Sequence, residues 1–301
     1  MSTNANGVIP AAEKGTSLSA DAWRRLKKNK LAIVGAIVVV LMTVVCYIEP
    51  LTLGLVKTDA QTTNLPNAHQ PPSWDEPFGT DNLGRSYLAR VLVGGQVSLM
   101  VGLVATVVSV LIGTIYGAIA GYYGGKLDEI MMRVVDFFYG IPYMFLVILV
   151  MIMFSDTARG SAAPVFLALG MVQWLTTARI VRGQVLTLRH QEFVQAARVL
   201  GAGDMRIIFR HILPNTLGVV VVYATLTVPA VIILESFLSF LGLGVELSWG
   251  LLVSEGVGVV NPIHSYWWLL FFPSVFLAIT LFSLNFLGDG LRDAFDPRTR
   301  K

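Results

Sequence analysis

The sequence predicts an all-α, polytopic membrane protein with six transmembrane helices, and composition, hydropathy and patterning all lead to this prediction. Of its 301 residues, 54% are hydrophobic and only 14% are charged, and the mean hydropathy is +0.67. Soluble domains carry about 25% charged residues, so this chain has too little polar surface to cover its apolar side chains in water. The apolar residues also gather in uncharged runs long enough to cross a hydrocarbon core of about 30 Å.

Residues 1–30 are polar and form a predicted cytoplasmic N-terminal segment, in which Ser19 to Lys28 suits a short surface helix. The first transmembrane helix is expected within 31–56, where Leu31 to Ile48 is apolar and uncharged. A cleaved signal peptide is the alternative for this run. The run is longer than a typical signal core and no small-residue cleavage site follows it, so we expect a retained helix.

A periplasmic loop is predicted over 57–96, because prolines between residues 66 and 77 exclude a continuous helix there. Residues 97–288 are predicted to form a five-helix core, and the charged residues 289–301 form a cytoplasmic tail. The spans of the core are expected at Val97–Tyr122, Val134–Phe154, Ala163–Thr177, Leu217–Leu243 and Tyr266–Leu287.

Lys and Arg are distributed unevenly between the two sides that six spans define. If the N-terminus is cytoplasmic, only Lys57, Arg85, Arg90 and Arg159 among the 22 Lys and Arg residues fall outside. Positive charge near membrane spans stays on the cytoplasmic side, so both termini are predicted to be cytoplasmic. The net charge of +3 gives no support for nucleic-acid binding, and a single cysteine, Cys46, excludes an internal disulfide.

The internal loop 184–215 belongs to the longest polar stretch of the second half of the chain. Apolar residues share one helical face here: Phe193, Ala196, Ala197 and Leu200. Gly201 allows a sharp turn, the Asp204 carboxylate suits the start of a second short helix, and Pro214 suits the first turn of the next span. Periodicity leaves three alternatives open for an amphipathic helix of this kind. It lies on the lipid headgroups, packs on the bundle, or binds in a groove of a partner protein.

This loop resembles the coupling loop of permeases in ATP-binding-cassette importers, whose pattern is E-A-A, three residues, G, nine residues and I-x-L-P. The sequence has Gln195-Ala196-Ala197, then Gly201, then His211-Ile212-Leu213-Pro214 at these spacings. Gln195 replaces the glutamate of the pattern, and His211 replaces its first isoleucine. The resemblance implies that the residues coupling to an ATPase are Glu192, Gln195, Ala196, Ala197, Arg198, Gly201, Ala202, Asp204, His211, Leu213 and Pro214.

Further strings resemble the oligopeptide and dipeptide permease family, and in particular its C-type subunits: Phe78–Arg85, Gly121–Gly125, Glu235–Gly244 and Gly288–Ala294. The resemblance covers nearly the whole chain. It implies a type I importer permease fold in a bacterial inner membrane, a B-type permease partner, two cytoplasmic ATPases and a periplasmic peptide-binding protein. It also implies an oligopeptide substrate, with dipeptides, antimicrobial peptides, nickel or another small solute as alternatives.

The sequence has no G-x-x-x-x-G-K-[ST] phosphate loop, so ATP and Mg are expected on the partner ATPases. We expect no cofactor in this chain and no enzymatic activity. The four histidines lie scattered over loops, which gives no indication of a metal site.

Small and charged residues inside the spans are the remaining candidates. A stripe of glycines recurs at four-residue spacing: Gly113, Gly117 and Gly121. Such a stripe lets helix backbones approach closely, and we favour packing within the subunit over an interface between subunits. Glu235, near the outer end of its span, is a pathway candidate by default, although we favour a structural role. Asp136 is expected to pair with Arg133, three residues earlier on the same helix.

The main alternative class is a secondary transporter. It would require internal repeats or ionisable residues at the membrane midplane, and we find no convincing repeat. A channel would require a readable filter or charged rings, and a membrane enzyme would require a catalytic constellation. The sequence indicates neither.

Overall fold

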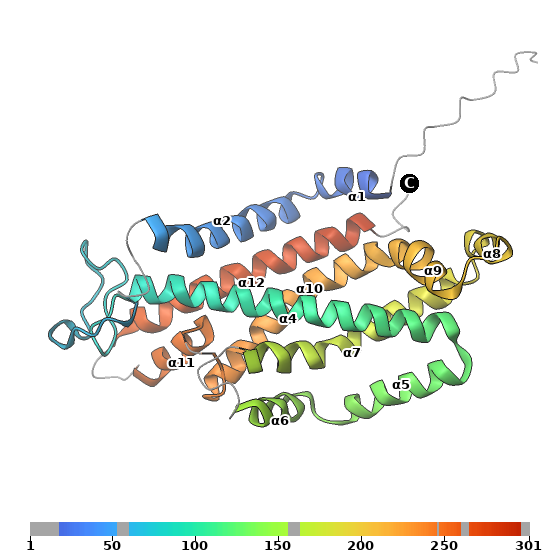
Figure 1. Ribbon diagram of the computed structural model, residues 1–301. Helices are drawn as coiled ribbons and strands as arrows, with labels where there is room; N and C mark the ends of the chain where they lie inside the picture. Colours follow the sequence, from blue (N-terminus) through green and yellow to red (C-terminus); the bar gives the residue numbers. More distant parts are fainter. Residues whose placement is uncertain (1–17, 53–59, 156–162, 246, 260–264, 296–301) are drawn as a thin grey trace, which may run out of the picture.

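In the computed structural model of the chain, long helices lie side by side along a common direction (Figure 1). The structure describes residues 18–52, 60–155, 163–245, 247–259 and 265–295. Within these ranges the regular structure is helical, apart from an isolated antiparallel bridge between Thr80 and Ser86. The all-α prediction is therefore confirmed, whereas the end of the predicted tail, 296–301, lies outside the described residues.

The helices follow in chain order as α1 Leu18–Leu26, α2 Lys30–Thr52, the 3-10 turn η1 Leu65–Asn67, α4 Tyr87–Tyr123, α5 Gly125–Gly140, α6 Tyr143–Ser155, α7 Ala163–Leu188, α8 Glu192–Val199, α9 Asp204–Ile207, the π-helical η2 Ile208–Ile212, α10 Leu213–Phe240, α11 Trp249–Val259 and α12 Trp267–Phe295.

Five helical units are long and apolar enough to cross a membrane: α2, α4, α7, the continuous unit from α9 through α10, and α12. The bent pair α5 and α6 gives a sixth span when it is counted as one, in agreement with the predicted number. Helices satisfy their backbone hydrogen bonds internally, which is required where no water is present.

The third span differs from the continuous helix predicted over Val134–Phe154. It is broken between α5 and α6, whose axes meet at 92°. Ile141 adopts an extended conformation with φ −88° and ψ 129°. The ring of Pro142 disfavours the helical conformation at the preceding residue, so the proline accounts for the break.

Two helix ends also differ from the predicted boundaries. Helix α4 begins at Tyr87 rather than at residue 97, shortly after Gly84, whose φ of +72° is the last left-handed backbone position of the loop. Helix α7 continues to Leu188, beyond the apolar run that ends near Thr177. The length of an apolar run therefore underestimates the length of a helix whose ends are polar.

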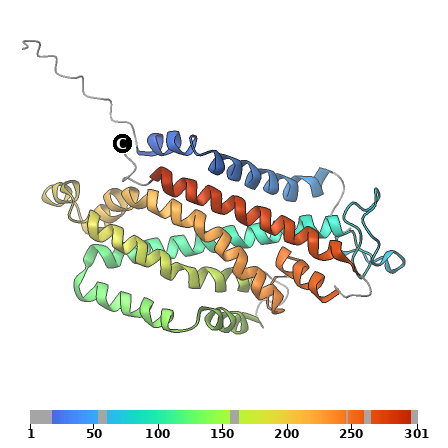
Figure 2. The ribbon, with the colours of Figure 1, turned by 180° about the vertical axis from the view of Figure 1, so that it is seen from behind.

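The two ends of the bundle carry different elements, as both ribbon views show (Figures 1 and 2). Residues 60–86 and α11 lie at one end, which we call the loop end. The opposite end, which we call the α8 end, carries α8, α9 and the C-terminal ends of α4 and α12. Helix α1 lies toward the same end, beside the C-terminal part of α12. The start of α2 is also close to this part of α12, because a Cβ atom at Gly290 would overlap Ala32.

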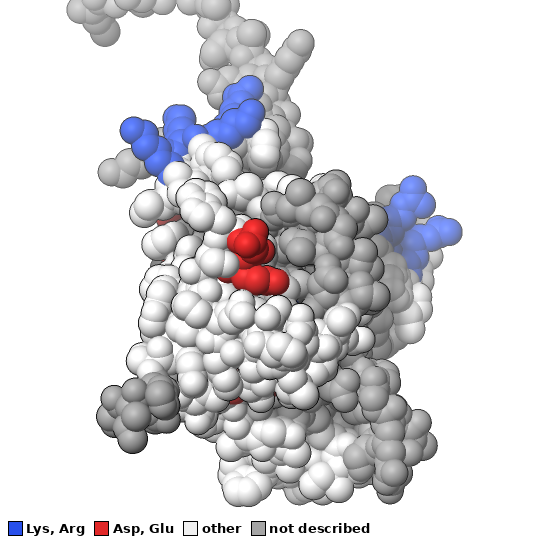
Figure 3. Space-filling model, turned by 90° about the vertical axis from the view of Figure 1, so that its left-hand side faces the viewer, with Lys and Arg blue, Asp and Glu red and all other residues white. Residues whose placement is uncertain are grey.

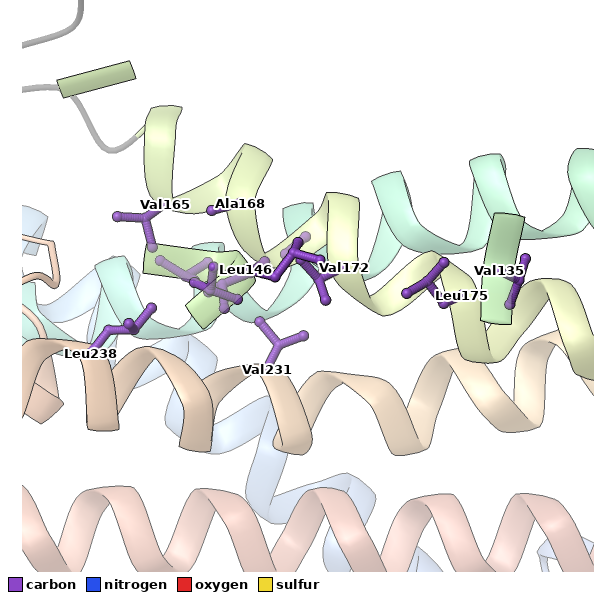
Figure 4. Packing of buried hydrophobic residues seen from close by; sticks show 12 residues of the cluster. Val135, Leu146, Val165, Ala168, Val172, Leu175, Val231 and Leu238 are labelled. Atoms are coloured by element: carbon purple, nitrogen blue, oxygen red, sulfur yellow. The ribbon is translucent and has the colours of Figure 1, made fainter. Parts of the chain in front are cut away.

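The largest apolar cluster lies where α4, α6, α7 and α10 meet (Figure 4). Val101 of α4, Leu146 and Val147 of α6, Leu169 of α7 and Val231 of α10 are almost fully buried there. Burying a side chain of this size stabilises a fold by roughly 1.5–3 kcal/mol in water. Inside a membrane, close packing contributes in its place, because lipid tails are as apolar as the core.

The glycine stripe of α4 lies against α7. A Cβ atom at Gly113 would meet the Thr177 Cβ at 2.6 Å, and one at Gly121 would meet the Arg182 carbonyl oxygen at 2.9 Å. A Cβ atom at Gly117 would overlap the Ala178 carbonyl oxygen. The structure thus places the stripe inside this subunit, between two of its longest helices.

Substitution of Gly117 by alanine is expected to destabilise the bundle, because the added methyl group overlaps backbone that cannot rotate away. Overpacking of this kind costs about 1–3 kcal/mol. The matched control is Gly183→Ala on α7, where a Cβ meets nothing within 4 Å and helix propensity improves. The thermal midpoint in detergent should fall for Gly117→Ala and hold or rise for Gly183→Ala; equal midpoints would contradict the packing described.

Candidate functional site

The segment between α7 and α10 folds as two short helices around a glycine turn, as the sequence predicts. Gly201 has φ +79°, a left-handed conformation that glycine adopts without strain. Its N–H donates to the Arg198 carbonyl and the Ala202 N–H donates to the Ala197 carbonyl, both at 3.0 Å. This paired pattern is a Schellman closure, which ends α8 and redirects the chain into α9.

Only a narrow face of α8 is buried. Val194 and Ala197 pack into a cluster with Ile207, Ile208 and Ile212 of the following turns. The face predicted from helical spacing is mostly exposed instead, since Leu200 is 85% exposed and Phe193 is 39% exposed. Spacing identifies a face but not its neighbour, and the face toward the bundle carries the smaller side chains.

The exposed apolar patch of this segment consists of Phe193, Val199, Leu200, Met205 and Phe209. Contiguous apolar patches are uncommon on water-facing surfaces and mark sites that contact protein or membrane. Val199 and Leu200 directly precede the turn at Gly201, and Figure 1 shows α8 at the tip of the α8 end.

The polar residues predicted for the segment have definite positions. Glu192 lies in the first turn of α8 and Arg198 in its last turn, where each charge is favourable to the helix dipole. The Gln195 side chain donates to the Arg189 carbonyl at 3.3 Å. Asp204 opens α9 and accepts a hydrogen bond from the Tyr122 hydroxyl at 2.7 Å.

The other predicted residues of the segment line its exit into the membrane span. Ala202 and Leu213 are partly buried against the cluster under α8, whereas Ala196 and Pro214 are exposed and His211 is partly exposed. Pro214 lies in the first turn of α10, directly after the π-helical η2. The wider π turn accommodates a ring that would clash with a regular α-helical carbonyl.

Tyr122 and Arg189 are contacts of this segment that the sequence analysis does not single out. Arg189 donates to the carbonyls of Gly121 and Tyr122 at 3.1 and 3.4 Å. Arg198 donates to the Tyr122 hydroxyl at 3.3 Å, which raises the pKa of that guanidinium above its ordinary value. The string Gly121–Gly125 resembles a family signature, but its spacing does not indicate a contact with a segment about 80 residues away.

At the loop end, a buried ion network joins α4 to the loop and to α11. Arg90 donates to Asp81 and Glu255, each at 2.8 Å, and the side chains of Arg90 and Asp81 are both 3% exposed. Asp81 also accepts from the backbone N–H groups of Leu83 and Arg85 at 2.9 Å. A cleft of about 250 Å³ opens beside this network.

The loop that carries Asp81 is fixed on α12 by aromatic contacts. Phe78 stacks on Phe272 with ring centroids 3.9 Å apart, and the Trp268 indole donates to the Thr80 carbonyl at 3.3 Å. Figure 3 views this end of the molecule and shows a group of acidic side chains near the middle of the face. The string Phe78–Arg85 therefore builds an ordered cap rather than a spacer.

Glu235 is fully buried inside the bundle near the end of α10. The Ser239 hydroxyl donates to its carboxyl group at 2.6 Å and lies 3.1 Å from the Ser248 hydroxyl. The Ser98 hydroxyl in the same region accepts from the Trp249 N–H at 3.1 Å. This cluster links α10, α11 and α4, and the structural role of Glu235 stays a prediction.

Asp136 does not pair with Arg133, contrary to the prediction from helical spacing. Its carboxylate accepts from Arg179 of α7 at 2.5 Å, whereas Arg133 pairs with Glu129. The Arg179 guanidinium also lies 4.0 Å from the ring centroid of Tyr139. A charged cleft of about 520 Å³ between α5 and α7 is lined by Gly125, Asp128, Glu129, Met132, Arg133, Asp136, Arg179 and Arg182.

The described residues contain no group of three or more His, Cys, Asp or Glu side chains placed to hold a metal ion. Their charged groups pair with one another across helices instead. A helical bundle of this kind, with a projecting helix–turn–helix at one end and an ordered cap at the other, defines a multi-pass membrane protein.

Comparison with known proteins gives the class and then the family. A solved structure titled as an inward-facing conformation of the MetNI methionine ABC transporter has a TM-score of 0.55, at 22% identity, over 68% of this chain and 95% of that chain. The fold is that of type I ABC importer permeases. The family model for the "Binding-protein-dependent transport system inner membrane component" matches residues 113–301, and the N-terminal transmembrane domain of oligopeptide transport permease C matches residues 17–72.

Curated relatives match almost the full length of the chain. The oligopeptide transport system permease protein OppC of Escherichia coli is 47% identical over 95% of this chain and 93% of its own length. OppC of Bacillus subtilis is 44% identical over 99% and 95%, and the dipeptide permease DppC of the same organism is 44% identical over 95% and 87%. The chain belongs to the family of binding-protein-dependent transport system inner membrane components, with the C-type oligopeptide and dipeptide permeases.

Removing the charge of Asp81 is expected to loosen the cap at the loop end. In Asp81→Asn, the buried Arg90 keeps only Glu255 as a charged partner, and breaking a buried pair costs about 3–5 kcal/mol. The control is Asp75→Asn, an exposed residue of the same loop. Hydrogen exchange of residues 78–90 should rise in Asp81→Asn and stay unchanged in Asp75→Asn; unchanged exchange in both would show that the network does not hold the cap.

Proposed function

We propose that this permease forms half of the translocation pathway of an ATP-driven, binding-protein-dependent importer of oligopeptides. A B-type permease would form the other half, two cytoplasmic ATPases would bind ATP and Mg, and a periplasmic binding protein would deliver the peptide. In this proposal the chain itself catalyses no reaction and works within the lipid bilayer of a bacterial inner membrane. The observation that carries the proposal is the projecting segment of residues 192–212, which combines the coupling-loop spacing with an exposed apolar patch.

The patch is the kind of surface that a groove on a folded partner protein recognises. A helix binds in such a groove through apolar side chains on one face, and here Phe193 and Leu200 supply that face. The rigid turn at Gly201 fixes the two side chains in place before a partner arrives, which reduces the ordering entropy lost on binding. We therefore assign the patch to an ATPase subunit rather than to lipid headgroups.

The distribution of cations supports a cytoplasmic α8 end. Arg24 and Arg25 of α1, together with Arg206 and Arg210 around η2, lie at this end. At the loop end, Arg90 is buried in an ion network and Arg85 pairs with Asp81. Since positive charge is retained on the cytoplasmic side, we place both termini and the α8 end in the cytoplasm.

The substrate assignment follows from the relatives named for oligopeptide transport, which match the chain over 95–99% of its length. A dipeptide importer is the second candidate, because a dipeptide permease matches at 44% identity. Uptake of labelled peptides of increasing length by the assembled complex in vesicles distinguishes the two. Preference for dipeptides over longer peptides would replace the oligopeptide assignment.

A valine at Gly201 is expected to uncouple uptake from ATP. Its branched side chain is strained at φ +79°, by about 1–3 kcal/mol, so the turn that presents the patch would shift. We expect ATP-driven peptide uptake in proteoliposomes to fall about tenfold or more, since tenfold corresponds to about 1.4 kcal/mol, which lies within that range of strain. The matched control is Gly203→Ala, because Gly203 has φ −68° and a Cβ there meets nothing within 4 Å.

Both variants should remain monodisperse in detergent. Uptake by Gly201→Val equal to that of Gly203→Ala would contradict a coupling role for the turn. Uptake that the wild-type chain drives from an ion gradient without ATP would instead indicate a secondary transporter.

A further inference from the structure

Tyr122 occupies the last turn of α4 and is only 5% exposed, although its hydroxyl group serves two charged side chains. The hydroxyl donates to Asp204 at 2.7 Å and accepts from Arg198 at 3.3 Å. The Arg198 guanidinium lies 5.8 Å from the centroid of the Tyr122 ring. One side chain of a membrane span therefore holds a cation and an anion of the neighbouring segment.

These two partners lie on opposite sides of the glycine turn. Arg198 belongs to the last turn of α8, and Asp204 is the first residue of α9. A hydrogen-bond chain from a guanidinium through a hydroxyl to a carboxylate is polarised in one direction, and each bond strengthens the other. The turn is thereby tied to α4 at both of its ends.

The main chain of the same helix turn is held from α7. Arg189, which directly follows α7, donates to the carbonyls of Gly121 and Tyr122 and brings a positive charge to the C-terminus of α4. At Gly121 the backbones of α4 and α7 are also in close contact. The C-terminal turn of α4 thus contacts Arg189, which lies before α8, and also the residues on both sides of the glycine turn that follows α8.

A phenylalanine would fill the same space and keep the ring beneath Arg198, so packing does not explain the hydroxyl group. Arg198 and Asp204 also have access to water, so burial does not require the hydroxyl as their partner. What the hydroxyl adds is a fixed position of the turn relative to a helix that runs 37 residues to the loop end.

We propose that Tyr122 is a positioning residue that fixes the α8–α9 turn on α4, so that movement of α8 imposed by an ATPase moves α4 with it. The proposal rests on the coupling function proposed above and names the contact through which the movement enters the bundle. Loss of this contact leaves the exposed patch in place, and therefore separates binding of the ATPase from transmission of its movement.

The test uses the complete transporter complex in proteoliposomes and compares Tyr122→Phe with Tyr123→Phe. Tyr123 is the adjacent, half-exposed tyrosine, whose ring contacts Tyr122 edge-on. For Tyr122→Phe we expect normal co-purification of the ATPases and continued ATP hydrolysis, but about tenfold less peptide transported per ATP, as for the loss of a hydrogen bond to a charged group. Tyr123→Phe should match the wild type.

A second variant separates positioning from folding. Asp204→Ala, which removes the acceptor, should lower the same ratio, and in the Tyr122→Phe background it should produce little further loss, since both changes remove the same hydrogen bond. Three results would overturn the positioning role. They are an unchanged ratio of peptide transported per ATP in Tyr122→Phe, additive losses in the double variant, and failure of both single variants to assemble. Absence of ATP-dependent uptake by the wild-type complex would instead overturn the proposed function.

Discussion

The close contact between α4 and α7 is the constraint on which the rest of the structure depends. Three glycines let two long backbones approach until a single methyl group would not fit between them. Since lipid provides little hydrophobic driving force between helices, this contact contributes through packing alone. It also sets the position of everything attached to the two helices. At one end α7 leads into the α8–α9 segment, and at the other α4 holds the cap through Arg90 and through the Tyr87 N–H, which donates to the Gly79 carbonyl at 3.0 Å.

The two ends of the bundle differ in the burial of their charged and apolar side chains. The loop end buries the ion pair of Asp81 and Arg90, and the cap fixes its aromatic rings on α12. The α8 end exposes apolar side chains and keeps its charges near the surface. A closed end is suited to holding shape and an exposed end to binding a partner, which agrees with energy entering the permease at the α8 end.

Local sequence signals predict much of this structure, whereas contacts between distant segments are not accessible to them. Gly201 predicts the turn after α8 because the left-handed conformation is a property of one residue. Pro142 shows why the third span is not one helix: its effect on Ile141 outweighs the apolar run around it. Asp136 has a plausible partner at helical spacing, but Arg179 on another helix is its actual partner. The contact between Tyr122 and Asp204 joins segments far apart in the sequence and has no local signature.

We propose that residues 192–211 dock this permease onto ATPase subunits. Co-expression of the tagged chain with candidate ATPase and partner-permease subunits, followed by affinity purification, tests it most directly when these residues are replaced by a flexible linker. The account predicts that the ATPases co-purify with the intact chain and are lost with the linker variant, while the partner permease is retained with both. ATPases that co-purify equally with a folded linker variant would contradict it, as would an intact chain that transports without nucleotide.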